Sequence, residues 1–153
     1  MRVTRFHNIG DVTKYEGGNL HNANVMIFVY LESCPFCLEM LPEWNRFKNK
    51  MNRKQNLQIL EVNKEILQTV IRSDREYFSS KLKNIPFVPT VSLYIPTKKS
   101  YSYLGDRSCD DLTKFTNSLL YSGEKLAKPS DATSKQPKKS KKLSEKDRVR
   151  RIL

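Results

Sequence analysis

The chain has 153 residues, of which 38% are hydrophobic and 10% aromatic, which suits one packed domain of ordinary size. These values exclude a wholly disordered protein. No apolar run approaches the roughly 20 residues that cross a bilayer, so we expect no membrane contact. Residues 1–11 lack the apolar stretch of a signal peptide, and we therefore expect a cytosolic, nuclear or virion-associated setting.

The net charge of +12 is unevenly distributed along the chain. Residues 124–153 hold eleven Lys or Arg and four acids, which gives +7, and residues 1–123 carry the remaining +5. The distal segment has almost no large apolar side chains, so burial cannot offset the entropy lost on ordering it. The sequence therefore predicts a folded domain over residues 1–123 and a disordered basic tail over residues 124–153.

The Lys-rich tail has several interpretations. Its lysines suit contacts with an acidic protein or with nucleic-acid phosphates, or they form a nuclear localisation signal. The tail has no aromatic residue on which bases would stack, which argues against sequence-specific recognition of nucleic acid. A solvated tail without a partner remains the alternative.

The apolar pattern in the first half of the domain predicts one strand and one helix. The N-terminal segment Val3–Phe6 shows no clear pattern, whereas seven consecutive apolar residues, Val25–Leu31, predict a strand covered on both faces. Apolar residues at helical spacing then predict an amphipathic helix from Pro35 to about Asn52. Pro35 suits its first turn, and Pro42 in its interior is expected to kink it. The predicted buried stripe consists of Cys37, Met40, Leu41, Trp44, Phe47 and Met51.

The second half continues the alternation of strands and helices. Apolar residues between positions 57 and 62 predict a strand, and Lys64–Lys83 predicts one helix or a broken pair. Val91–Ile95 is a third predicted strand, and Tyr101–Leu104 a fourth that forms a hairpin with it. Ser108 followed by Asp111 matches a capping box and predicts a final helix. Helices that follow strands in this order predict an α/β sandwich. The final helix would bury Leu112, Phe115 and Leu119.

Two cysteines stand where the first predicted strand ends and the helix begins. A helix N-terminus offers unpaired N–H groups and a positive dipole end, which stabilise a thiolate at Cys34. The thiolate is the form that attacks disulfides. The three-residue spacing lets Cys37 reach back and resolve a mixed disulfide. We expect Cys34 to be the exposed nucleophile and Cys37 the buried resolving thiol, with no metal or organic cofactor required.

A zinc site is the main alternative for this Cys pair. The chain has three cysteines, a number that does not describe a secreted scaffold held by several disulfides. Zinc would need two further ligands, usually another close pair. Cys109 is isolated, and His7 and His21 lie far upstream, so a redox pair is favoured over zinc. Cys109 itself is either a third reactive thiol or, as we favour, a small buried cysteine.

Three segments, in the right order between about residues 25 and 120, resemble the thioredoxin superfamily, which includes the protein disulfide isomerase domains. Residues 34–42, Cys-Pro-Phe-Cys-Leu-Glu-Met-Leu-Pro, resemble the family's active-site helix with its internal proline. Residues 87–91, Phe-Val-Pro-Thr-Val, are similar to its proline-threonine segment that opens a strand. Residues 103–105 and 112–115 resemble its closing strand, glycine and last helix. The resemblance implies a thioredoxin-like fold, a mixed central sheet flanked by helices, and partners that are protein thiols and disulfides.

The resemblance also implies where a substrate would bind. Pro89 would be a cis proline facing the Cys pair, and the backbone of Val88 would offer hydrogen bonds to a bound peptide. Pro35 and Phe36, between the two cysteines, would complete the substrate contacts.

Two departures from the family pattern favour a second hypothesis. Ser33 stands where the family commonly has Trp, and Phe28 stands where it has a buried acid that helps move the resolving thiol's proton. The alternative is thus a binding or structural module, for example a virion component, with little redox turnover. The many Lys and Asn residues are compatible with a large DNA virus, since such viruses encode thioredoxin-like proteins.

Overall fold

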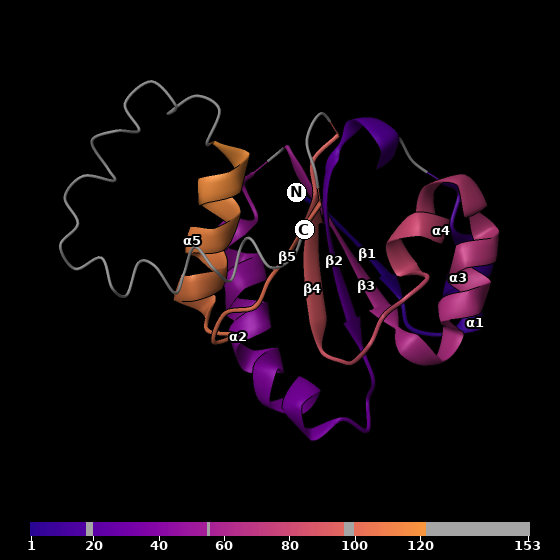
Figure 1. The fold of residues 1–153 in the computed structure, drawn as a ribbon, viewed down its shortest axis with the longest axis horizontal. Coiled ribbons are helices and arrows are strands. Elements are labelled where there is room, and N and C mark those ends of the chain that lie inside the picture. The colour runs from indigo at the N-terminus through magenta and orange to yellow at the C-terminus, as the bar shows by residue number, and fades with distance from the viewer. Residues whose placement is uncertain (18–19, 55, 97–99, 122–153) are drawn as a thin grey trace, which may run out of the picture.

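The computed structural model describes residues 1–17, 20–54, 56–96 and 100–121, and the predicted tail at 124–153 lies outside them. Within these residues a five-stranded sheet stands between two layers of helices (Figure 1). Its strands are β1 (Arg2–Phe6), β2 (Asn24–Tyr30), β3 (Leu57–Asn63), β4 (Thr90–Tyr94) and β5 (Ser100–Ser102).

The sheet is mixed, with the strand order β1-β3-β2-β4-β5. Strands β1 and β2 both run parallel to β3, whereas β4 is antiparallel to β2 and β5 is antiparallel to β4. Residues 25–29 of the central strand β2 are all buried, because helices cover both of its faces. The order and directions of the strands, with helices on both sides, confirm the predicted thioredoxin-like fold.

The helices divide between the two faces of the sheet (Figure 1). On one face lie α1 (Ile9–Lys14), α3 (Leu67–Ser73) and α4 (Arg75–Leu82); on the other lie α2 (Pro35–Met51) and α5 (Cys109–Leu120). Two short 3₁₀ turns complete the described elements, η1 (Leu20–Asn22) and η2 (Lys64–Ile66). None of the helices in the described part of the chain could span a membrane.

Side chains that alternate along β2 build one core on each face. Val25, Ile27 and Val29 pack toward α1, α3 and α4, and Met26 and Phe28 pack toward α2 and α5. The second core holds Met40, Trp44, Phe47 and Met51 of α2, four residues of the predicted stripe. This packing fixes α2, and with it the two cysteines at its start, against the end of β2.

Local sequence signals set several helix boundaries. The segment predicted as one helix or a broken pair is a broken pair: Asp74 ends α3, and its carboxylate accepts the N–H of Tyr77 at 3.1 Å to begin α4. Helix α1 begins with a reciprocal capping box between Asn8 and Asp11. Pro42 lies inside α2, which continues without a break to Met51.

Two details of the predicted helices are wrong. Leu41 does not belong to the buried stripe: it is 38% exposed, because it lies about 100° around α2 from Met40, beyond the buried edge. The capping box at Ser108 is only half formed. Its hydroxyl accepts the N–H of Asp111 at 3.1 Å, but its own N–H donates to Asp106 instead. The carboxylate of Asp111 is engaged by the hydroxyl of Tyr103.

Candidate active site

Cys34 occupies the N-cap position of α2. Its Sγ accepts the N–H of Cys37 at 3.2 Å, and its carbonyl oxygen accepts the N–H groups of Cys37 and Leu38 at 3.1 and 3.0 Å. Pro35 follows at the start of the helix, where a missing N–H costs nothing. The sulfur therefore faces the donor end of the helix, as its position in the sequence predicts.

The two sulfurs differ in exposure. Cys34 is partly exposed, whereas Cys37 is only 2% exposed, and both are free thiols in this structure. The structure therefore places the exposed and the buried member of the pair where the sequence predicts the nucleophile and the resolving thiol.

The environment moves the pKa values of the two thiols in opposite directions. Burial tends to raise the pKa of Cys34, but hydrogen bonds from Cys37 and from the N–H of Phe36, together with the charge of Arg107, bring it below the ordinary value of 9.0. Burial first, and then the hydrogen bond with Cys34, raise the pKa of Cys37 to about 11. The Cys34 thiol therefore ionises at a lower pH than the Cys37 thiol.

Arg107 is a site residue that the sequence reasoning missed. Its guanidinium carbon lies 5.6 Å from the centre of the Phe36 ring, and its charge lowers the pKa of both cysteines. Its backbone has a φ of 68°, and its N–H donates to the hydroxyl of Tyr103 at 2.9 Å. The available signal was its place in the loop before α5, which the family resemblance brings to the active-site end.

The loop before β4 approaches Cys34 from the other side. The peptide bond between Val88 and Pro89 is cis, and the thiol of Cys34 lies 3.8 Å from the carbonyl oxygen of Val88, to which it donates. Pro89 is buried and Val88 half-buried, whereas Phe87 beside them is 54% exposed. A groove of about 270 Å³, lined in part by Phe87, Thr90 and Leu104, flanks this loop.

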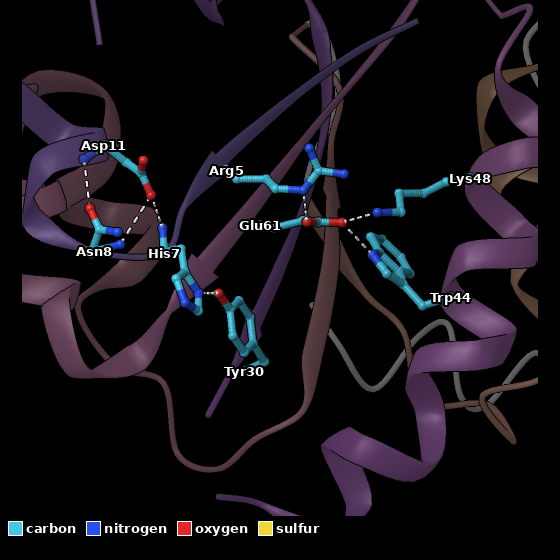
Figure 2. A network of polar contacts seen from close by, with 8 residues as sticks. All are labelled: Arg5, His7, Asn8, Asp11, Tyr30, Trp44, Lys48 and Glu61. Atoms are coloured by element: carbon cyan, nitrogen blue, oxygen red, sulfur yellow. Dashed lines mark hydrogen bonds and ion pairs between the residues drawn. The ribbon is translucent and has the colours of Figure 1, made fainter. Parts of the chain in front are cut away.

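The buried thiol lines a cavity of about 410 Å³ on the α2 side of the sheet. Phe28, Tyr30 and Glu61 also line it. Glu61 is only 8% exposed, and its carboxylate receives Trp44 Nε1 at 2.7 Å, Lys48 Nζ at 2.5 Å and Arg5 Nε at 3.1 Å (Figure 2). The sequence reasoning missed Glu61 because it treated residues 57–62 as an apolar strand.

A second polar group borders the same cavity. The Nδ1 atom of His7 contacts the Tyr30 hydroxyl at 2.9 Å (Figure 2). Its Nε2 atom contacts Glu32 Oε2 at 2.9 Å. Burial, and next the charge of Glu61, raise the pKa of Tyr30 to about 12, so this phenol stays protonated at neutral pH.

The third cysteine, Cys109, does not belong to the Cys34–Cys37 pair and lies in a buried environment. Cys109 is 5% exposed at the start of α5, and its N–H donates to Glu43 Oε1 at 2.7 Å. This agrees with the favoured prediction of a small buried cysteine. Among the described residues, no group of three or more His, Cys, Asp or Glu side chains is arranged to hold a metal ion.

Comparison with known proteins finds solved structures that have a similar fold. No family model matches the chain. The J-Trx1 fragment of ERdj5 matches with 19% identity over 74% of this chain and 49% of that one, at a TM-score of 0.49. The first two thioredoxin domains of Eps1p from Naumovozyma dairenensis match with 22% identity over 62% and 34%, at 0.46. Deadhead, a germline-specific thioredoxin from Drosophila melanogaster, matches with 15% identity over 64% and 82%, at 0.44.

These neighbours are thioredoxin-fold proteins. This chain spans about half the length of the first and about a third of the second. The assignment of its site depends on its own geometry: a Cys pair at a helix start, a cis-proline loop beside it and a cavity behind it.

Proposed function

We propose that the chain is a thiol-disulfide oxidoreductase that acts on protein disulfides through Cys34 and Cys37. The observation that carries the proposal is the position of Cys34 Sγ, which caps α2 and lies 3.8 Å from the Val88 carbonyl, with Cys37 buried behind it. One sulfur is thus presented to a substrate and the second is held ready to displace it.

The reaction in the reducing direction has two exchanges. The Cys34 thiolate attacks one sulfur of a substrate disulfide, the substrate S–S bond breaks, and the released thiolate takes up a proton. Cys37 then loses its proton and attacks Cys34 Sγ, which releases the second substrate sulfur as a thiol. The chain is left with a Cys34–Cys37 disulfide, so the dithiol supplies both electrons. In the oxidising direction the same steps run in reverse.

The surface around Cys34 suits an extended, apolar peptide. Phe36 and Phe87 are 58% and 54% exposed, and Leu104 is 38% exposed beside the groove. The backbone of Val88 offers hydrogen bonds that carry no sequence preference. We propose that Pro35, Phe36, Val88 and Pro89 contact the substrate chain on either side of its disulfide.

The electrostatics favour the first exchange. Arg107 places a positive charge near Cys34, and the donors at the start of α2 favour the thiolate over the thiol. The thiolate is the state that attacks a disulfide, so the lowered pKa of Cys34 favours this attack.

A trapping experiment tests the proposal. With an oxidised protein substrate such as insulin, the Cys37→Ser chain should accumulate a covalent mixed disulfide that a thiol reductant releases. Cys34→Ser should accumulate none, and Cys109→Ser should behave as the wild type, because Cys109 is buried away from solvent. Equal trapping by the Cys34→Ser and Cys37→Ser chains would contradict the proposal.

The setting and the tail's partners remain proposals drawn from the sequence. We propose a cytosolic, nuclear or virion-associated protein, and we assign the +7 segment 124–153 to contacts with an acidic protein or nucleic acid. This segment lies outside the described residues.

A further inference from the structure

The acid that the sequence lacks on β2 has a counterpart on the neighbouring strand. Phe28 stands where the family resemblance places a buried acid, and it is 1% exposed in an apolar core. Its register partner across the parallel pair β2–β3 is Glu61. A buried carboxylate therefore lies one strand away from the usual position, on the same side of the sheet as α2, whose Trp44 and Lys48 it contacts.

The Glu61 side chain is contacted by donors from two elements. Lys48 and Trp44 of α2 donate to Oε2, and Arg5 of β1 pairs with Oε1 (Figure 2). The side chains of Lys48 and Glu61 are only 13% and 10% exposed, so both charges are largely removed from water. Burying a charge is costly unless it is paired, and an apolar residue at this position would avoid that cost.

A cavity links this carboxylate to the resolving thiol. Cys37 and Glu61 both line the same space of about 410 Å³. A water molecule occupies roughly 30 Å³ in the liquid, so the space has room for several, and polar groups are available to hold them. The titratable and charged groups around it are Arg5, His7, Tyr30, Glu32, Cys37 and Glu61.

The second exchange requires a group that accepts the proton of the Cys37 thiol. Cys37 is 2% exposed and its pKa is raised to about 11, mainly by burial, so the protonated thiol predominates at pH 7. A positioned general base removes this limitation by taking the proton as the sulfur attacks. Tyr30 is protonated at neutral pH, and His7 and Glu32 are exposed to solvent, so Glu61 is the buried carboxylate on the cavity wall.

We propose that Glu61 is the proton acceptor for Cys37, acting through water in the cavity, and this proposal rests on the proposed oxidoreductase function. The Cys37 S–H bond breaks as its proton passes to the Glu61 carboxylate, and the Cys37 sulfur forms a bond to Cys34. The bond between Cys34 and the substrate sulfur breaks. The substrate leaves as a thiolate, which takes a proton from water, and Glu61 returns its own proton to the solvent through the cavity.

The two exchanges can be measured separately with dithiobis(nitrobenzoate), whose released thiolate is coloured. In the reduced full-length chain carrying Cys109→Ser, attack by Cys34 releases one coloured thiolate in a phase that depends on reagent concentration. Attack by Cys37 on the mixed disulfide releases the second in a phase that does not. The proposal concerns only the rate of the second phase.

The expected result is a specific loss in that phase. Glu61→Gln should leave the first phase within about twofold and slow the second at least tenfold at pH 7, within the range of general-base effects. The wild-type second phase should be nearly independent of pH from 6 to 8, whereas in Glu61→Gln it should rise about tenfold per pH unit, following the Cys37 thiolate.

Two controls separate proton transfer from structure. Lys48→Gln breaks the same ion pair but keeps the carboxylate, so its second phase should keep the flat pH profile. Glu43→Gln removes an ion-paired acid of α2 that does not line the cavity, and its second phase should match the wild type. Slow, pH-dependent second phases in Lys48→Gln as well as Glu61→Gln would assign Glu61 a structural role and overturn the proposal. A wild-type second phase in Glu61→Gln would also overturn it. Failure of the wild-type chain to release a second thiolate would instead refute the oxidoreductase function itself.

Discussion

Replacing Gly105 by Ala should disrupt the loop that carries Arg107. A Cβ built on Gly105 would lie closer than 3.0 Å to Asp111 Oδ2 and to two atoms of the Tyr103 ring and hydroxyl. The backbone of Gly105 does not require positive φ, so the conflict is one of space alone. Tyr103 is 9% exposed and packs in the core under α5, which leaves its ring little freedom to move aside.

The magnitude follows from the contacts that would be lost. The Tyr103 hydroxyl donates to the Asp111 carboxylate at 2.5 Å, and a hydrogen bond to a charged group contributes about 1.5–3 kcal/mol. Overpacking adds about 1–3 kcal/mol. We expect the free energy of unfolding to fall by about 3 kcal/mol and the Tm by about 10 °C for a domain of this size.

Urea unfolding followed by fluorescence measures this loss, because Trp44 is the only tryptophan and is fully buried. Gly10→Ala is the matched control: its Cβ would meet only Asn8 Oδ1, at 3.1 Å, so stability should change by less than about 1 kcal/mol. A loss below 1 kcal/mol in Gly105→Ala, equal to that control, would refute the packing argument. Arg107 donates its N–H to Tyr103, so the variant should also raise the pKa of Cys34.

Three further predictions concern the site and the core. The alkylation rate of Cys34 by iodoacetamide should rise with pH through an inflection below 9.0, since only the thiolate reacts, and Arg107→Gln should move that inflection upward; an unchanged profile would remove Arg107 from the site. Trp44→Phe should lower the free energy of unfolding by about 1–3 kcal/mol, because Glu61 loses a buried donor, and a neutral effect in urea unfolding followed by circular dichroism would contradict this. Leu60→Ala should lower it by about 2–5 kcal/mol, since Leu60 is fully buried, and a loss under 1 kcal/mol would show that the core collapses around it.

The sequence predicts the elements that have strong local signals. The apolar run at 25–31 and the helical stripe at 37–51 each identify one element, and their junction places Cys34 at a helix start. The N-terminal strand β1 gave no such signal, because it lies at the sheet edge and buries only Phe6 fully. Helix α1 was missed as well, because it has six residues and buries a single side chain, Val12.

The site was predictable only where its parts are adjacent in the sequence. Cys34 and Cys37 form a local motif, and the family resemblance supplied the segment around Val88. Glu61 depends on three partners from β1 and α2, distant in the chain, that make burial of an acid tolerable. Arg107 reaches the site through a turn that Tyr103 and Asp111 hold in place. Such placements follow from tertiary packing, so no local pattern reveals them.

The central claim is that Cys34 and Cys37 form a reversible dithiol/disulfide couple. A redox titration of the purified chain against glutathione, with free thiols trapped and counted, tests it most directly. We expect two thiols per wild-type chain to disappear together in one two-electron transition, Cys109 to stay reduced throughout, and the transition to be absent in Cys34→Ser. Thiols that stay reduced at every glutathione poise, or that bound zinc protects, would contradict it.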